Sequence, residues 1–318
     1  MLVRGVPVRA DSVALHDYGV SEQNGDIRPI LADATTTLAR AGVATPRVDA
    51  ELLAAHLLGV SRGALVLAGP LNAEQAGRYR RLVADRAART PLQHLVGTAP
   101  FRRLELAVGP GVFIPRPETE LLVDWGLAGL RGDRPVVVDL CSGSGAVALA
   151  VADEYPGARV HAVEVDAAAL TWLRRNVQRY RRGAGSVTVL AGDATSPAPL
   201  AQLNGMVDLV LCNPPYVPSG TPVDPEVADH DPPGAVFGGP DGLAVIRGIV
   251  ARSVRLLRPG GRLGIEHDDS HAGVLSDLLR EAGAYAEVTG HRDLAGRPRF
   301  ATAVRRDIPT GRLAHLPP

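Results

Sequence analysis

The chain has 318 residues, of which 46% are hydrophobic and 21% charged, and its 34 basic residues balance 34 acidic ones. This length and composition predict about two folded domains and exclude a largely disordered chain. Zero net charge argues against a strongly cationic protein that binds nucleic acid mainly through phosphates. No segment of the sequence approaches the ~18 to 20 consecutive apolar residues of a membrane helix, so we expect a soluble, cytoplasmic protein without a membrane partner.

Two cysteines are too few for a disulfide framework, and apart from histidine every basic residue is arginine. Cys141 and Cys212 match no zinc-binding spacing, so we expect reduced thiols that line a pocket, and whether they approach each other at neighbouring strand ends stays open. A chain without lysine cannot form a Schiff base or use the lysine of a phosphate-binding loop. The sequence therefore excludes these two kinds of chemistry.

The first part of the chain is predicted to be helical. Residues 1–25 lack periodicity and are expected to form a flexible lead-in, whereas residues 26–90 place apolar residues at helical spacing. Asn72 is followed three residues later by Gln75, which is the spacing of a capping box at the start of a helix. We therefore predict a small all-helical N-terminal domain over residues 26–90, and we assign substrate recognition to it.

A different pattern follows in residues 91–117, where prolines and glycines are crowded together. Between them the segment FRRLELAV, residues 101–108, alternates apolar and polar side chains as a short strand does. We expect residues 91–117 to form a connector that contains a hairpin.

From residue 118 to residue 306, short apolar runs alternate with helical ones. This order predicts a catalytic domain built on a mostly parallel sheet with helices on both faces. The last two strands, 284–289 and 300–304, have no helix between them and predict an antiparallel C-terminal edge. Residues 307–318 are expected to form a tail. Because open α/β sheets bind ligands beyond the carboxyl ends of their strands, the residues at those ends are the candidate site.

The first strand of this domain, residues 136–140, leads into the glycine-rich segment 141–145. Its two glycines, Gly143 and Gly145, permit a tight turn and the close approach of a ligand to the backbone. Glu164 ends the next strand 21 positions after Gly143, where an acid accepts hydrogen bonds from an adenosine ribose. The loop fits a dinucleotide or S-adenosylmethionine, and the lack of a third glycine for a pyrophosphate favours S-adenosylmethionine.

Two further strand ends carry candidate residues. Asp193 follows the third strand, where it would meet the adenine edge or serve as an ordinary turn residue. Asn213-Pro214-Pro215-Tyr216 ends the fourth strand beside the glycine-rich loop. The two prolines remove two N–H donors, so this turn offers carbonyl oxygens and a side-chain amide oxygen to a ligand. Such a pocket is suited to an NH₂ group.

The NPPY turn, with the glycine-rich loop and the ribose acid ahead of it, resembles that of methyltransferases that act on planar nitrogen. RTPLQHLVGT at 89–98 and GVFIPRPETELLV at 111–123 are similar to the HemK/PrmC family, which methylates the glutamine of the Gly-Gly-Gln motif in class I peptide chain release factors. FGGPDGL, LLRPGGRLGIEH and RDLAGRPRF continue the resemblance, which covers about residues 28–306. It implies a Rossmann-like, S-adenosylmethionine-dependent fold and N5 methylation of that glutamine.

The resemblance also implies roles for individual residues. Asn213 and the carbonyl of Pro214 would accept hydrogen bonds from the glutamine amide, with Pro215 stiffening the turn, while Tyr216 would wall the pocket. From the connector, Phe113 would press on the substrate. Arg116 would brace the connector and help to bind the substrate. The cofactor would contact Cys141, Ser142, Gly143, Ser144, Gly145, Glu164, Asp193 and Asn213. Cys141 and Ser142 stand where the family usually has Gly and Thr. No metal is implied, and we expect a monomer.

Two other functions remain open from the sequence. The same turn would serve an adenine-N6 or guanine-N2 nucleic-acid methyltransferase, and the arginine-rich stretch 78–89 keeps this alternative, although a solvated helix face explains it equally. The second alternative is an inactive methyltransferase fold that serves as a scaffold. The cluster of acids and histidines at 266–271 lacks the helical spacing of metal ligands, so we expect a solvated loop there.

Overall fold

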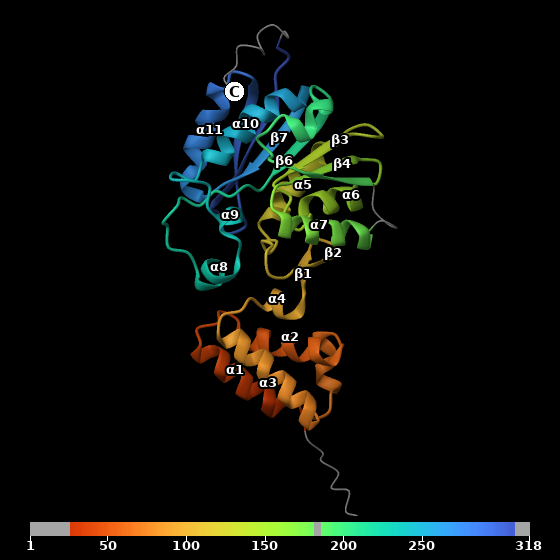
Figure 1. Ribbon diagram of the computed structural model, residues 1–318, viewed down its shortest axis with the longest axis vertical. Coiled ribbons are helices and arrows are strands. Elements are labelled where there is room, and N and C mark those ends of the chain that lie inside the picture. Colours follow the sequence, from red (N-terminus) through yellow and green to blue (C-terminus); the bar gives the residue numbers. More distant parts are fainter. Residues whose placement is uncertain (1–25, 181–185, 309–318) are drawn as a thin grey trace, which may run out of the picture.

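The computed structural model describes residues 26–180 and 186–308. The lead-in predicted for residues 1–25, and the predicted tail from residue 309 onward, lie outside the described residues. Helices occupy one end of the molecule and an α/β part occupies the other (Figure 1). None of the described helices is long and apolar enough to cross a lipid bilayer.

The N-terminal helices pack around a small core of their own. Their bounds are α1 (Arg28–Arg40), α2 (Pro46–Leu58), a 3₁₀ turn (Arg62–Leu67) and α3 (Ala73–Ala87). Leu38, Leu53 and Tyr79 are almost fully buried, and the Tyr79 hydroxyl donates to the carbonyl of Ala50 at 2.8 Å. The capping box predicted at the start of α3 is present, with both reciprocal hydrogen bonds between Asn72 and Gln75. The described part of this region contains helices and no strand, as its periodicity indicates.

A short helix and a hairpin connect this bundle to the sheet. Helix α4 (Leu92–Val96) ends at Gly97, and an antiparallel pair follows, β1 (Thr98–Phe101) and β2 (Leu104–Ala107). The hairpin packs on the same apolar cluster as one face of the large sheet. It therefore holds the segment that follows it, residues 108–118, against the α/β part.

The large sheet has seven strands in the order β5-β4-β3-β6-β7-β9-β8. The first five in this order are parallel and the last two pairings are antiparallel, which confirms the predicted sheet and its C-terminal edge. The strands are β3 (Val136–Leu140), β4 (Arg159–Glu164), β5 (Ser186–Ala191), β6 (Val207–Cys212), β7 (Leu257–Glu266), β8 (Tyr285–Arg292) and β9 (Pro298–Arg305).

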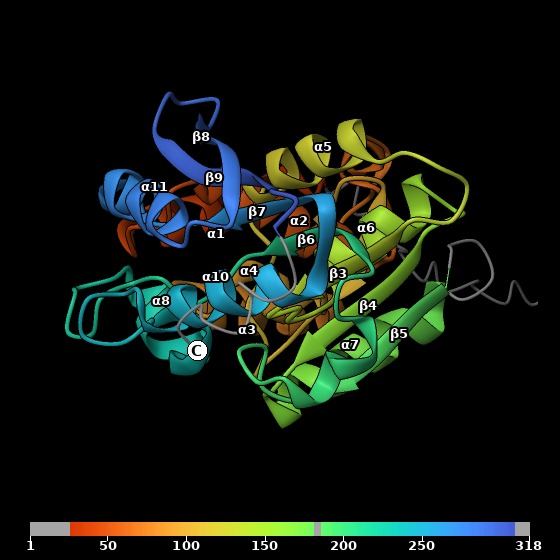
Figure 2. The same cartoon turned by 90° about the horizontal axis from the view of Figure 1, so that it is seen from above.

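Helices cover both faces of this sheet, because alternate side chains of the buried strands point to opposite sides. One apolar cluster joins the sheet to α5 (Thr119–Gly129), α6 (Ala146–Glu154) and α7 (Ala167–Tyr180). The other joins it to a 3₁₀ turn (Ala198–Leu203), α10 (Ala244–Leu256) and α11 (Ala272–Glu281), which follows a second short turn (Asp269–His271). Figure 2 shows α5 and α10 on opposite sides of β7.

Two short helices that the sequence pattern did not predict lie between β6 and α10. They are α8 (Pro225–His230) and α9 (Pro233–Val236). This segment begins directly after the NPPY turn and carries α8 to the side of the α/β part that faces the N-terminal helices (Figure 1). It therefore connects the candidate site to the helical region.

Candidate active site

The topology brings the two candidate turns together. After β3 the chain builds β4 and β5 on one side and then returns to the other side of β3 to form β6. Leu140 and Cys212, the last residues of these neighbouring strands, lie opposite each other in the register. Ligands of open α/β sheets bind at such a switch point because the two loops diverge there. The glycine-rich loop and the NPPY turn consequently border one cavity.

This cavity has a volume of about 1160 Å³. Of the site residues predicted from the sequence, it is lined by Phe113, Arg116, Cys141, Ser142, Gly143, Ser144, Glu164, Asp193, Asn213, Pro214, Pro215 and Tyr216. Gly145 is outside the lining and begins α6 with φ of 88°. A Cβ atom at Gly145 would meet Leu173 at 2.6 Å, so this position needs glycine for the turn and its packing.

The glycine-rich loop is held by Glu164. The backbone N–H of Gly143 donates to Oε2 of this carboxylate at 2.8 Å, and the N–H groups of Val165 and Asp166 donate to Oε1 at 2.8 Å each. Three donors fix a side chain that is only 8% exposed. At the loop start, Cys141 has φ of 59°, a left-handed conformation that suits the glycine found there in the family it resembles.

We expect Glu164→Gln to weaken S-adenosylmethionine binding by about tenfold to a hundredfold. Glutamine at this position replaces one acceptor oxygen by an NH₂ donor. This NH₂ group faces a backbone N–H that also donates, and the ribose has one acceptor fewer. Titration calorimetry measures the Kd directly. A Kd that changes less than twofold would contradict a ribose-binding role for Glu164.

Asp193 fits both interpretations offered by the sequence. Its side chain is exposed, lines the cavity, and accepts from the backbone N–H and the hydroxyl of Thr195 at 2.8 Å each. It therefore fixes its own turn at the cavity wall. A contact with adenine stays a prediction.

The side chain of Asn213 points into a buried polar network. Its Nδ2 donates to the Thr119 hydroxyl at 3.2 Å, and that hydroxyl donates to Oε2 of Glu266 at 2.7 Å. The Tyr216 hydroxyl donates to Oε1 of the same carboxylate at 3.2 Å. Sequence reasoning missed Thr119 and considered Glu266 only as part of an acidic loop. The position of Glu266 at the end of β7, the strand next to β6, was the signal for its place here.

The solvated loop predicted at residues 266–271 is wrong for three of its members. Glu266, at the end of β7, His267, directly after it, and His271, in the short turn that follows, are at most 7% exposed. In the described part of the chain, histidines, cysteines and acids form no group of three or more that could hold a metal ion. Burial raises the pKa of Glu266 to about 7. Burial likewise raises the pKa of Asp139, which borders the same cavity, to about 7.

The burial of Glu266 predicts a pH effect on stability. Between pH 4.5 and 7 the folded protein keeps this proton while the unfolded chain has released it. The folded state then binds more protons, so the contribution of Glu266 to the free energy of unfolding falls by about 3 kcal/mol as pH rises through this window. We expect urea unfolding of Glu266→Gln to show a flatter dependence on pH than that of the wild type. Parallel curves for the two proteins would contradict the raised pKa.

The two cysteines lie close together, a point that the sequence left open. Both thiols are free, and burial together with the neighbouring Cys141 raises the pKa of Cys212. Cys141 lines the cavity, whereas Cys212 is fully buried in the sheet and is not part of the lining. The expectation of pocket-lining thiols thus holds for Cys141 alone.

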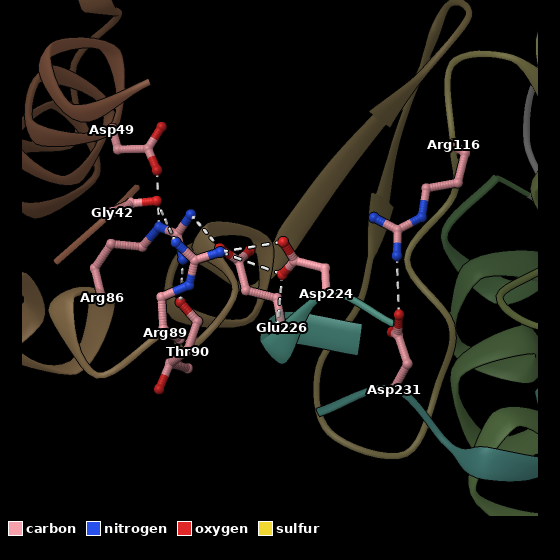
Figure 3. Close-up of polar contacts among 9 residues, drawn as sticks. All are labelled: Gly42, Asp49, Arg86, Arg89, Thr90, Arg116, Asp224, Glu226 and Asp231. Atoms are coloured by element: carbon pink, nitrogen blue, oxygen red, sulfur yellow. Dashed lines mark hydrogen bonds and ion pairs between the residues drawn. The ribbon is translucent and has the colours of Figure 1, made fainter. Parts of the chain in front are cut away.

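Phe113 and Arg116 approach the cavity from the connector. The Arg116 guanidinium stacks over the Phe113 ring, 4.7 Å from its centre, and donates through Nη2 to Asp231 at 2.8 Å. Figure 3 shows this ion pair between the connector and the segment that follows α8. Arg116 therefore braces the wall that presents Phe113. Contact of either side chain with a substrate stays a prediction.

Two comparisons with known proteins bear on this site. The model of the PrmC N-terminal domain matches residues 30–97, and that of the methyltransferase small domain matches residues 119–229. The chain is 54% identical to the release factor glutamine methyltransferase of Mycolicibacterium smegmatis over 279 residues, which are 88% of this chain and 98% of that protein. The namesake from Streptomyces coelicolor is 50% identical over 284 residues, with the same two coverages. The chain belongs to the release factor glutamine methyltransferase family.

Family membership confirms the resemblance read from the motifs. A solved structure, the hMettl16 catalytic domain in complex with MAT2A 3′UTR hairpin 6, shares the fold at a TM-score of 0.50 and 16% identity. The match covers 72% of this chain and 83% of the hMettl16 chain. At 16% identity this likeness shows the fold alone. The two family matches leave residues 98–118 between them, which is the hairpin and connector segment that carries Phe113 and Arg116.

In this member of the release factor glutamine methyltransferase family, one arginine of α3 and one just after it pair with acids at the start of α8. Arg86 donates through Nε to Asp49 at 2.7 Å, and its Nη2 lies 2.9 Å from Glu226 (Figure 3). Arg89 pairs with Glu226 at 2.9 Å and with Asp224 at 3.2 Å. The solvated helix face predicted for residues 78–89 is therefore wrong for these two arginines, because α8 covers them. Arg78, Arg80 and Arg81 are exposed as predicted.

Proposed function

We propose that this protein transfers a methyl group from S-adenosylmethionine to the side-chain amide nitrogen, N5, of the glutamine in the Gly-Gly-Gln motif of class I release factors. One observation supports this most strongly. The acceptor-rich turn Asn213–Tyr216 shares a single cavity with the glycine-rich loop and Glu164. An amide substrate and an adenosyl ligand can thus meet at the switch point of the sheet.

The cofactor would lie along the carboxyl ends of β3, β4 and β5. Glu164, already oriented by three backbone donors, would accept from the ribose, and Asp193 would face the adenine. The residues of 141–144 that line the cavity would contact the methionyl part. When bound, S-adenosylmethionine supplies a methyl group on a positively charged sulfur, which is a good leaving group.

The chain itself has to activate and aim a poor nucleophile. The lone pair of an amide nitrogen is delocalised into its carbonyl, and Asn213 Oδ1 and the Pro214 carbonyl would accept from its two N–H bonds. These acceptors localise electron density on nitrogen and hold it ~3 to 3.5 Å from the methyl carbon, in line with the bond that breaks. They bind more strongly as positive charge develops on nitrogen, so they stabilise the transition state more than the ground state. The sulfur would leave as the neutral thioether S-adenosylhomocysteine, and the nitrogen would release one proton to solvent, so that the product amide keeps one N–H.

Substrate recognition would combine the N-terminal helices with the cavity mouth. The ion pairs between α3 and α8 hold the helical region against the segment that follows the NPPY turn. A loop that carries the glutamine would enter between Phe113 and Tyr216. Because release factors act in the cytoplasm, we propose that the protein works there, as a monomer.

Mass spectrometry of methylated products tests this function. Purified release factor, its variant with the motif glutamine replaced by alanine, and nucleic acid would each be incubated with the enzyme and labelled S-adenosylmethionine. We expect one methyl group on the motif glutamine and none on the variant. Label in nucleic acid alone would support the adenine or guanine methyltransferase instead, and binding without transfer to any substrate would indicate a scaffold.

A further inference from the structure

A buried carboxylate lies directly beneath the NPPY turn. Glu266 is 1% exposed, and each of its oxygens accepts a hydrogen bond from one hydroxyl. Thr119 donates to Oε2 and Tyr216 donates to Oε1. Thr119, which is 3% exposed, in turn accepts from the side-chain amide of Asn213. The two NPPY side chains that carry polar groups are thus connected to one acid on another strand.

When Glu266 is ionised, the hydrogen bonds in this network have a fixed direction. An ionised carboxylate only accepts, so the single hydrogen of the Thr119 hydroxyl is committed to Glu266. Towards Asn213 the hydroxyl oxygen has only lone pairs to offer. The carboxamide of Asn213 must therefore present its NH₂ end to Thr119 and its oxygen to the cavity.

This direction matters for the reaction, and the inference rests on the proposed function. The glutamine amide is an NH₂ donor, so a flipped Asn213 would oppose donor to donor and remove one of the two acceptors that aim the nitrogen. We propose that Thr119 and Glu266 are positioning residues that fix the Asn213 carboxamide with Oδ1 towards the substrate amide. Both border the cavity but are almost fully buried, and in this proposal both act on the substrate through Asn213.

The size of the effect follows from the hydrogen bond that is lost. Removing the Thr119 hydroxyl leaves the NH₂ of Asn213 without its partner, and the two orientations of the carboxamide become similar in energy. A net loss of about one hydrogen bond in the transition state corresponds to about a tenfold fall in kcat. The Kd for S-adenosylmethionine should change less than twofold, because no bond to that ligand is altered.

The test is a double-mutant cycle with Thr119→Val and Asn213→Ala, assayed at pH 8, where Glu266 is ionised. Valine has nearly the shape of threonine and lacks the hydroxyl, whereas Thr119→Ser restores it. The measured quantities are kcat and KM with purified release factor, and the Kd for S-adenosylmethionine. Thr171→Val is the matched control, since it removes an exposed hydroxyl that bonds a carbonyl of its own helix.

We expect Thr119→Val to lower kcat about tenfold, Thr119→Ser to recover most of the rate, and Thr119→Val to have no further effect once Asn213 is alanine. Additive losses in the cycle, or equal losses in the valine and serine variants, would assign Thr119 a merely structural role and overturn the inference. So would a valine variant with wild-type kcat. A wild-type enzyme that leaves release factor unmethylated would overturn the proposed function, and the inference with it.

The opposite end of the network provides a second approach that does not depend on how well Thr119→Val folds. Glu266→Gln can keep its carbonyl oxygen towards Thr119 and turn its NH₂ to the Tyr216 oxygen, so we expect it to retain most of the rate. Glu266→Leu removes the acceptor, frees the Thr119 hydrogen to turn towards Asn213, and should lower kcat about tenfold. A leucine variant as active as the glutamine variant would overturn the inference.

Discussion

Substituting Asn213 by alanine is expected to lower kcat for release factor methylation by about 10² to 10³, the usual effect of deleting one acceptor or donor that stabilises developing charge. The variant loses Oδ1, which we assign to the substrate amide, while the backbone of the turn is held by two prolines. The Kd for S-adenosylmethionine should rise less than about tenfold. Single-turnover kinetics together with calorimetry separate the two quantities.

A matched control is Asn72→Ala. This change removes the cap of α3, which is not part of the cavity lining, and should lower the free energy of unfolding by about 1 kcal/mol without altering kcat. Turnover by Asn213→Ala at the wild-type rate would exclude the proposed role of Asn213. A parallel loss of S-adenosylmethionine binding would show that Asn213 binds the cofactor and not the substrate amide.

Replacing Arg86 by methionine should produce the largest change in stability. The Arg86 side chain is 6% exposed and also donates to the carbonyl of Thr90 at 3.1 Å. Its loss leaves the buried carboxylate of Asp49 without a countercharge and Glu226 with one cation fewer. Breaking a buried pair in this way costs about 3 to 5 kcal/mol. Urea unfolding followed by circular dichroism measures the change.

The control for this prediction lies on the same helix. Arg81→Met removes an exposed arginine and should change the free energy of unfolding by less than about 0.5 kcal/mol. Adding Asp49→Asn to Arg86→Met should recover part of the loss, because the unpaired charge is then gone. Equal stability of the Arg81 and Arg86 variants would show that the contact between α3 and α8 contributes little.

Much of the fold could be predicted because local patterns specify it. The run 136–140 and the glycines after it identify a strand that turns into a helix, and repeated alternation of this kind predicts a parallel sheet. The boundaries were less accurate: the sequence pattern predicts a strand over residues 262–266, whereas β7 begins at Leu257, five residues earlier. The apolar run there is interrupted by Pro259 and two glycines, which hide its first residues.

The candidate site was predictable only where one segment carries the chemistry. The NPPY turn and the glycine-rich loop are each contiguous, so the sequence alone identifies their residues as candidates. Thr119 and Glu266 are separated by 147 positions and meet through the order of the strands, which no local pattern encodes. The same holds for Arg89 and Asp224, which are 135 positions apart. Their partners became visible only in the folded chain.

A crystal structure with S-adenosylhomocysteine and a peptide that contains Gly-Gly-Gln would test most directly how the chain grips the amide. The account predicts the glutamine nitrogen within about 3.2 Å of both Asn213 Oδ1 and the Pro214 carbonyl oxygen, and facing the sulfur of the ligand. A glutamine bound elsewhere, or a turn whose acceptors face away from that sulfur, would contradict it.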